Sequence, residues 1–118
     1  MKGSYVLKNT VANANFFLDR KEIPKRLDVF VKPGEKVTQD TDRNLAEFAR
    51  LFGENAQIVR HASTAALTKE FDINTFPAFV INNKMRLGGL QSADAIKVHY
   101  CSMNKLPECK KELTKSLV

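Results

Sequence analysis

The residues with the most distinctive chemistry in this chain are its only two cysteines, Cys101 and Cys109, which lie eight positions apart. This spacing differs from the Cys-x-x-Cys motif of dithiol enzymes. It leaves three interpretations open: a structural disulfide closing a helix-turn-helix, two unpaired cysteines with packing roles, and a displaced redox pair. A disulfide around so short a loop would stabilise the fold by about 2–3 kcal/mol and would suit an oxidising compartment.

The other polar side chains form no recognisable catalytic or metal-binding motif. His61 and His99 are far apart in sequence, whereas a metal site needs three or four convergent ligands. The sequence contains no Gly-rich phosphate loop, no nucleophile elbow and no His-Glu-x-x-His segment. We therefore predict neither a metal ion nor a cofactor.

Length and composition indicate a single domain over residues 1–118. Hydrophobic residues make up 43% of the 118 positions and charged residues 27%, a balance typical of a folded chain. The 19 basic and 13 acidic side chains leave a net charge of +6. This excess suits an acidic partner, and a basic nucleic-acid-binding domain is an alternative, although no nucleic-acid-reading motif accompanies the charge.

Apolar runs are much shorter than the roughly 20 residues that cross a bilayer, and no secretory signal is visible near Met1. These features predict a soluble, cytoplasmic protein. A disulfide between Cys101 and Cys109 would instead indicate an extracytoplasmic protein whose signal has been removed.

Hydrophobic periodicity predicts alternating strands and helices in the first half of the chain. Arg26–Val31, rich in β-branched and aromatic residues, is expected to form a central strand that Pro33-Gly34 closes. An amphipathic helix is expected from about Asp40 to Phe52, with Gly53 as its stop. A second strand over 56–60 and a short helix capped by Ser63 or Thr64 follow.

The second half of the chain predicts a hairpin and two further helices. Phe76–Ile81 and Lys84–Leu87 are expected to pair across the Asn82-Asn83 turn, before Gly88-Gly89. Ser92 should cap a helix to about residue 103, and a final helix should run from 107 to about 117. A further strand is expected around 15–19. The core should bring together apolar side chains from both halves, namely Phe30, Phe48, Phe52, Phe79 and Ile96.

This order favours an α/β domain with a mixed sheet. Within it, the segment from Phe71 to Lys84, with Thr75-Phe76-Pro77 between a helix and a hairpin, resembles the second half of the thioredoxin superfamily. The resemblance covers about residues 26–103. It implies a thioredoxin-like fold, a central mixed sheet flanked by helices, with an N-terminal strand extension and an extra C-terminal helix over 104–118. In that family the proline is cis and faces the active-site loop, so a cis bond is expected at Phe76–Pro77.

The chain departs from that family at the position of the active-site loop. Redox members carry Cys-x-x-Cys directly after the strand that corresponds to Leu27–Val31, whereas this chain has no cysteine between Lys32 and Gln39. A dithiol mechanism needs a nucleophilic thiolate and a resolving partner. The usual thioredoxin reaction is therefore not expected at this position.

These features predict a redox-inactive binding or assembly module, and the missing dithiol motif favours a binding protein over an enzyme. We expect it to recognise an extended peptide or a protein at Thr75, Phe76 and Pro77, with a positive rim on the facing loop that suits acidic partners. The rim is expected to consist of Lys32, Gly34 and Lys36. The alternative function is a thiol-disulfide oxidoreductase or redox sensor that uses Cys101 and Cys109.

Overall fold

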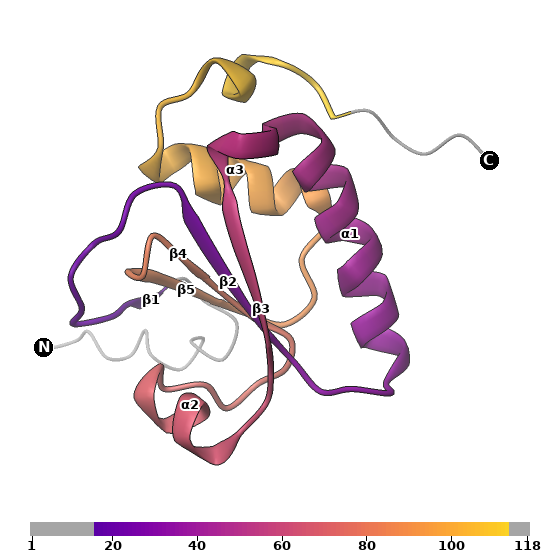
Figure 1. Cartoon of the computed structure of the whole chain (residues 1–118), viewed down its shortest axis with the longest axis vertical. Helices are drawn as coiled ribbons and strands as arrows, with labels where there is room; N and C mark the ends of the chain where they lie inside the picture. The colour runs from indigo at the N-terminus through magenta and orange to yellow at the C-terminus, as the bar shows by residue number, and fades with distance from the viewer. Residues whose placement is uncertain (1–15, 114–118) are drawn as a thin grey trace, which may run out of the picture.

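A five-stranded mixed sheet forms the centre of the molecule in the computed structural model, which describes residues 16–113 (Figure 1). Its spatial order is β1-β5-β4-β2-β3, and only β2 and β3 are parallel. No helix within the described residues is long and apolar enough to cross a membrane. The strands are β1 (Phe16–Phe17), β2 (Arg26–Val31), β3 (Gln57–Ala62), β4 (Ala78–Ile81) and β5 (Met85–Gly88).

Three α-helices flank this sheet, so the predicted mixed α/β architecture is confirmed. They are α1 (Lys36–Phe52), α2 (Ala65–Glu70) and α3 (Ala93–Met103), and two short 3-10 helices are η2 (Gly53–Asn55) and η3 (Pro107–Lys110). The predicted caps of the last two α-helices are also present. Thr64 accepts a hydrogen bond from the Leu67 N–H, and Ser92 accepts one from the Ala95 N–H.

Helix α1 begins four residues earlier than the sequence pattern predicts, at Lys36 instead of Asp40. The left-handed φ of +86° at Gly34 turns the chain into the helix directly after β2. Thr41 lies within the helix, where its hydroxyl donates to the Val37 carbonyl oxygen. The hydroxy and acidic residues around position 40 therefore belong to the helix and do not cap it.

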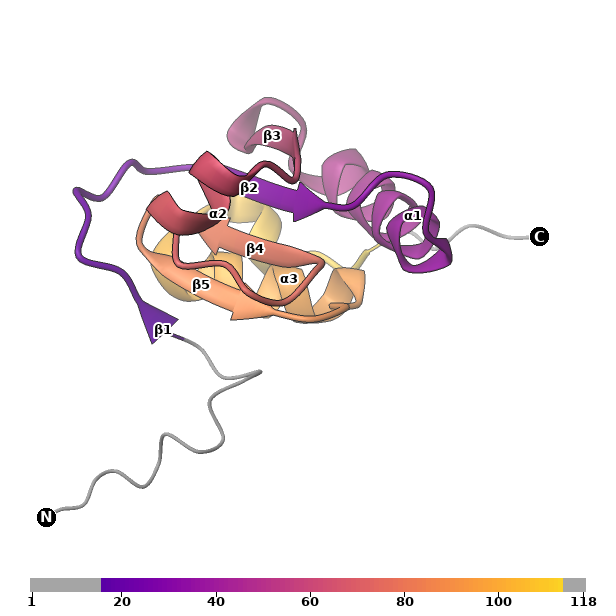
Figure 2. The ribbon, with the colours of Figure 1, turned by 90° about the horizontal axis from the view of Figure 1, so that it is seen from below.

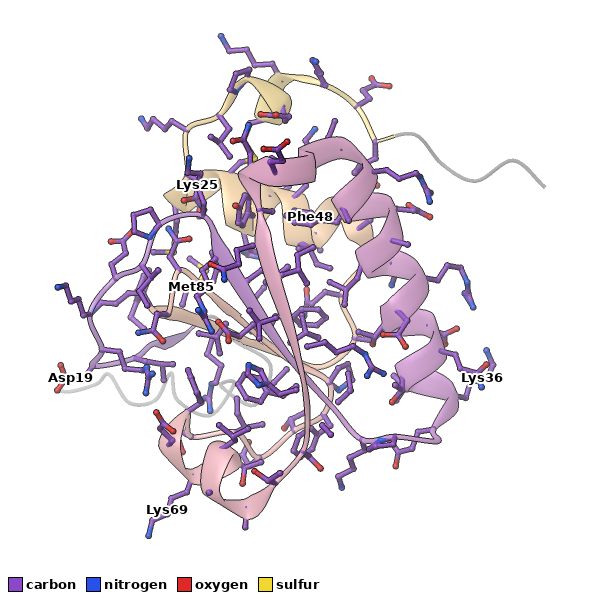
Figure 3. All side chains as sticks on the ribbon, in the orientation of Figure 1. Asp19, Lys25, Lys36, Phe48, Lys69 and Met85 are labelled. Carbon is purple, nitrogen blue, oxygen red and sulfur yellow. A yellow bond between two sulfur atoms is a disulfide. The ribbon has the colours of Figure 1, made fainter. Side chains whose placement is uncertain are left out.

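The larger core lies between one face of the sheet and helices α1 and α3. Alternate residues of the strands point to this face, and the helices supply side chains at helical spacing. Figure 3 shows Phe48 between α1 and the sheet. The fully buried members are Leu27, Val29, Val31, Phe48, Phe52, Phe79, Ile81, Leu87, Ile96 and Tyr100.

Phe30 lies on the opposite face, so the prediction that it joins Phe48, Phe52, Phe79 and Ile96 is wrong. It belongs to a second core with Phe71, Ile73, Ala78 and Val80, next to the short helix α2. The period of two along β2 directs Val29 and Val31 to one face and Phe30 to the other. Because β2 is central, both of its faces are buried.

The segment after α3 forms one 3-10 turn instead of the predicted final α-helix. Residues 107–110 make η3, and Lys111 is already extended, with φ −99° and ψ 157°. A disulfide joins Cys101 of α3 to Cys109 of η3, with Cα atoms 5.9 Å apart, which ties this turn to the preceding helix. The rest of the predicted helix, 114–118, lies outside the described residues.

Two buried asparagines join the hairpin turn to the end of α3. The Asn82 amide donates to Asn104 Oδ1 at 2.9 Å, and the Asn104 amide donates to Asn82 Oδ1 at 3.1 Å. The Lys25 backbone N–H also donates to Asn104 Oδ1, at 3.0 Å. These bonds satisfy polar groups that would otherwise destabilise the interior, and they position the start of β2.

Tyr100 combines core packing with one polar contact. Its ring meets Phe48 and Phe52 edge to face, and its hydroxyl donates to the Asn55 carbonyl oxygen at 2.5 Å. Burial, with a smaller contribution from the nearby Glu108 carboxylate, raises the pKa of Tyr100 to about 12.

Truncation of either large core ring should destabilise the protein strongly. We expect Phe48→Ala and Phe79→Ala each to lower the free energy of unfolding by about 3–5 kcal/mol, through lost burial and a residual cavity. Denaturant titration measures this change, and Val98→Ala on the exposed side of α3 serves as the control. In the double variant Phe30→Ala/Phe48→Ala, the two losses in the free energy of unfolding should add, because the two rings lie on opposite faces of the sheet. Unchanged midpoints for both single variants would contradict this core.

The raised pKa of Tyr100 predicts a loss of stability in alkaline solution. The folded state favours the neutral phenol. The contribution of Tyr100 to the free energy of unfolding is therefore fully present below pH 10 and is lost as the pH rises from 10 towards 12. Denaturant titrations across this range should show the decline, and Tyr100→Phe should remove it. The variant should also lose about 1 kcal/mol at neutral pH, since the Asn55 carbonyl loses its donor. An identical alkaline decline in the variant would show that another group is responsible.

Candidate functional site

The β2–α1 connection forms one side of the predicted peptide site. Lys32, Gly34 and Lys36 are all exposed on it. The Thr38 hydroxyl donates to the Lys32 carbonyl oxygen at 2.5 Å, which holds the start of this loop against the first turn of α1. The loop is therefore anchored at the point where β2 ends.

The α2–β4 connection forms the other side and carries Thr75, Phe76 and Pro77. The peptide bond between Phe76 and Pro77 is cis, as the sequence led us to expect. Pro77 is buried, and its carbonyl oxygen accepts a hydrogen bond from the Gly89 N–H at 2.8 Å. Thr75 and Phe76 remain half-buried. The sheet thus fixes one end of this segment while its preceding residues reach the surface.

The two connections meet through a cation–π contact. The Lys32 ammonium nitrogen lies 5.1 Å from the centre of the Phe76 ring. Lys36 instead pairs with Asp40 on its own helix, 3.3 Å away, so its charge is partly offset. Of the predicted rim, Lys32 therefore contacts the facing loop, whereas Lys36 turns along α1 and Gly34 provides only the bend.

The backbone beside this contact offers unused hydrogen-bonding groups. Within residues 16–113, no hydrogen bond joins the N–H or C=O of Thr75 or Phe76 to the rest of the protein. Among the described residues, the Thr75 hydroxyl makes one hydrogen bond, a long one of 3.4 Å to Oδ1 of the neighbouring Asn74. Polar backbone at a half-buried position is normally paired, so this segment can accept an external partner.

A buried carboxylate in β2 is a feature that the sequence analysis did not identify. Asp28 is only 1% exposed and forms a bidentate pair with Arg26, with distances of 2.7 and 3.0 Å. His61 Nε2 lies 2.8 Å from the same carboxylate, and its ring stacks on Phe30 with centroids 4.7 Å apart. The hydrogen bond to Asp28 raises the pKa of Arg26 above its ordinary value.

The available signal for this cluster was an aspartate within the otherwise apolar run Leu27–Val31. An acidic residue in a strand buried on both faces requires partners, and Arg26 two positions away on the same face is the obvious one. His61 could not be assigned from sequence, because its place beside Asp28 depends on the parallel register of β2 and β3.

The cysteines lie at the other end of the molecule. Their disulfide lines a hollow of about 640 Å³, together with Lys105, Leu106, Pro107 and Lys110. Glu108 turns away from this lining, and its Oε2 accepts a hydrogen bond from the Asn55 amide at 2.8 Å. Its own backbone N–H, the Asn55 amide and the charges of Lys111 and Lys25 hold the pKa of Glu108 below its ordinary value.

The described part of the chain brings together no group of three or more histidine, cysteine, aspartate or glutamate side chains that could hold a metal ion. Within residues 16–113, the Asp28–His61 pair has no third such ligand beside it. Arg26 and His61 therefore serve as the hydrogen-bonding partners of the buried Asp28 carboxylate.

Comparisons with known proteins give a similarity of fold and no information on function. No protein family model matches the chain, and no curated protein is similar to it in sequence. A solved structure described as that of a malarial protein superposes with a TM-score of 0.57 at 10% identity, covering 69% of this chain and 97% of the other. At this identity the similarity concerns the fold alone.

Proposed function

We propose that this chain is a thioredoxin-like module without a catalytic dithiol, and that it binds an extended segment of a protein partner beside the Phe76–Pro77 loop. One observation carries the proposal. The Lys32–Phe76 contact lies next to backbone groups of Thr75 and Phe76 that have no partner within residues 16–113.

The order of elements supports the thioredoxin-like assignment. A strand, a helix, a parallel strand and a second helix precede the β4–β5 hairpin and α3, as in the pattern on which the resemblance was based. The loop after β2 lies against the residues that precede β4, as the family would place it. The loop carries no thiol, since both cysteines are in the disulfide at the far end.

An extended chain fits the free groups of this site better than a compact ligand does. A strand-like segment can exchange backbone hydrogen bonds with Thr75 while its side chains alternate between the two loops. Phe76 offers an apolar contact, and Lys32 favours a carboxylate next to it. The small hollow of about 10 Å³ beside Thr75 leaves little room for a buried small molecule.

A charge-reversal titration tests this function. The probes are the peptides acetyl-Val-Glu-Val-Glu-Val-amide and its lysine counterpart, added to ¹⁵N-labelled protein. We expect the acidic peptide to shift the amide resonances of Lys32, Thr75 and Phe76. Lys32→Glu should weaken its binding by about fivefold, the equivalent of one exposed ion pair of about 1 kcal/mol. Phe76→Ala should weaken the binding of both peptides.

The matched control is Lys69→Glu, which makes the same change in net charge on α2. It should leave the affinity for the acidic peptide within error of the parent protein. Equal weakening by Lys69→Glu and Lys32→Glu would show that overall charge drives binding. Resonance shifts confined to other surfaces would contradict the proposed site.

A further inference from the structure

The disulfide and the hollow beside it occupy the end of the molecule that is remote from the proposed peptide site. Figure 1 shows the segment that follows α3 at the end opposite α2. Figure 2 looks along this direction from below, so α2 lies in front and that segment lies behind the strands. The proposed peptide function uses neither the cysteines nor this hollow.

Both sulfur-bearing residues are accessible from the hollow. Cys101 and Cys109 are half-buried and form part of its lining, unlike the fully buried side chains of the main core. Pro107 is exposed at its edge, and Leu106 contributes an apolar, half-buried wall. A small molecule can therefore approach the disulfide without disrupting the sheet or its helices.

The charge of the lining is positive. Lys105 and Lys110 are exposed and line the hollow on either side of Pro107. The nearest carboxylate in sequence, Glu108, is held by Asn55 and does not belong to the lining. Two ammonium groups beside a disulfide attract anions and stabilise a thiolate that forms there.

We propose that this hollow is a binding site for small anionic thiols, and that the Cys101–Cys109 disulfide exchanges with them. The thiolate sulfur of the small molecule forms a bond to Sγ of one cysteine, the Sγ–Sγ bond breaks, and its electron pair leaves on the other Sγ as a thiolate. The thiolate of a second small molecule then attacks the small-molecule sulfur of the mixed disulfide, the bond between that sulfur and Sγ breaks, and Sγ leaves as a thiolate. The products are a small-molecule disulfide and two cysteine thiols, which take up the two protons of the reacting thiols.

The charge of the attacking thiol provides the test. Three small thiols serve as probes of the folded protein at low salt: 3-mercaptopropionate (anionic), 2-mercaptoethanol (neutral) and cysteamine (cationic). Alkylation and mass spectrometry follow the reduction, and each rate is divided by the thiolate concentration and corrected for thiolate basicity. We expect the corrected rate for the anionic thiol to exceed that for the cationic thiol by about tenfold, and the difference to shrink in 1 M salt.

Two double variants test the role of the lysines. Lys105→Glu/Lys110→Glu should reverse the order of the corrected rates, and Lys105→Gln/Lys110→Gln should abolish the difference between them. The charge-matched control is Lys21→Glu/Lys69→Glu, which alters two exposed lysines outside the lining and should preserve the order. Figure 3 shows Lys69 on α2, away from the C-terminal segment. Circular dichroism verifies that each variant is folded.

Two results would overturn the proposal. Corrected rates that are equal for the three thiols, and unchanged by Lys105→Glu/Lys110→Glu, would show that the lysines do not guide exchange. A reduction rate that does not depend on thiol concentration would show that the disulfide reacts only after the protein unfolds. Neither result would affect peptide binding at Lys32 and Phe76, so the two proposals can fail separately.

Discussion

The architecture depends on the central position of strand β2, which must be covered on both faces and paired along both edges. Strand β3 pairs with one edge in parallel and β4 with the other in antiparallel orientation. Leu27, Val29 and Val31 face helices α1 and α3, while Phe30 faces the smaller core beside α2. Because the strand contributes to both cores at once, it links apolar side chains from distant parts of the chain on both faces of the sheet.

The same constraint explains the cluster around Asp28. A carboxylate in a doubly covered strand loses its hydration, so it persists only where other groups replace the water. Arg26 does so from the same strand and His61 from the neighbouring one. The cluster also links β3 to β2 through side chains, which reinforces the register of β3, an edge strand of the sheet within the described residues.

Strand β2 also separates two chemically different ends of the molecule. Its six residues span about 20 Å. Lys25, directly before the strand, bonds to Asn104 near the disulfide, and Lys32, directly after it, contacts Phe76. Lysine side chains are present at both ends, but their surroundings differ. The end at Lys32 offers unpaired backbone that suits an extended chain, and the end near Asn104 offers a disulfide in a positively charged hollow. In our proposals, the basic side chains of the protein therefore serve two distinct surfaces.

Local sequence signals determined most elements of this fold, because period, capping residues and turn residues act over a few positions. The β2 strand, the Asn82-Asn83 hairpin and the caps at Thr64 and Ser92 follow from such signals. Tertiary structure decided the features that depend on distant partners: the side of the sheet on which Phe30 lies and the single turn at η3, which the disulfide ties to α3. It also brought Lys32 to Phe76 and His61 to Asp28, since both contacts join segments that only the pairing of strands places side by side.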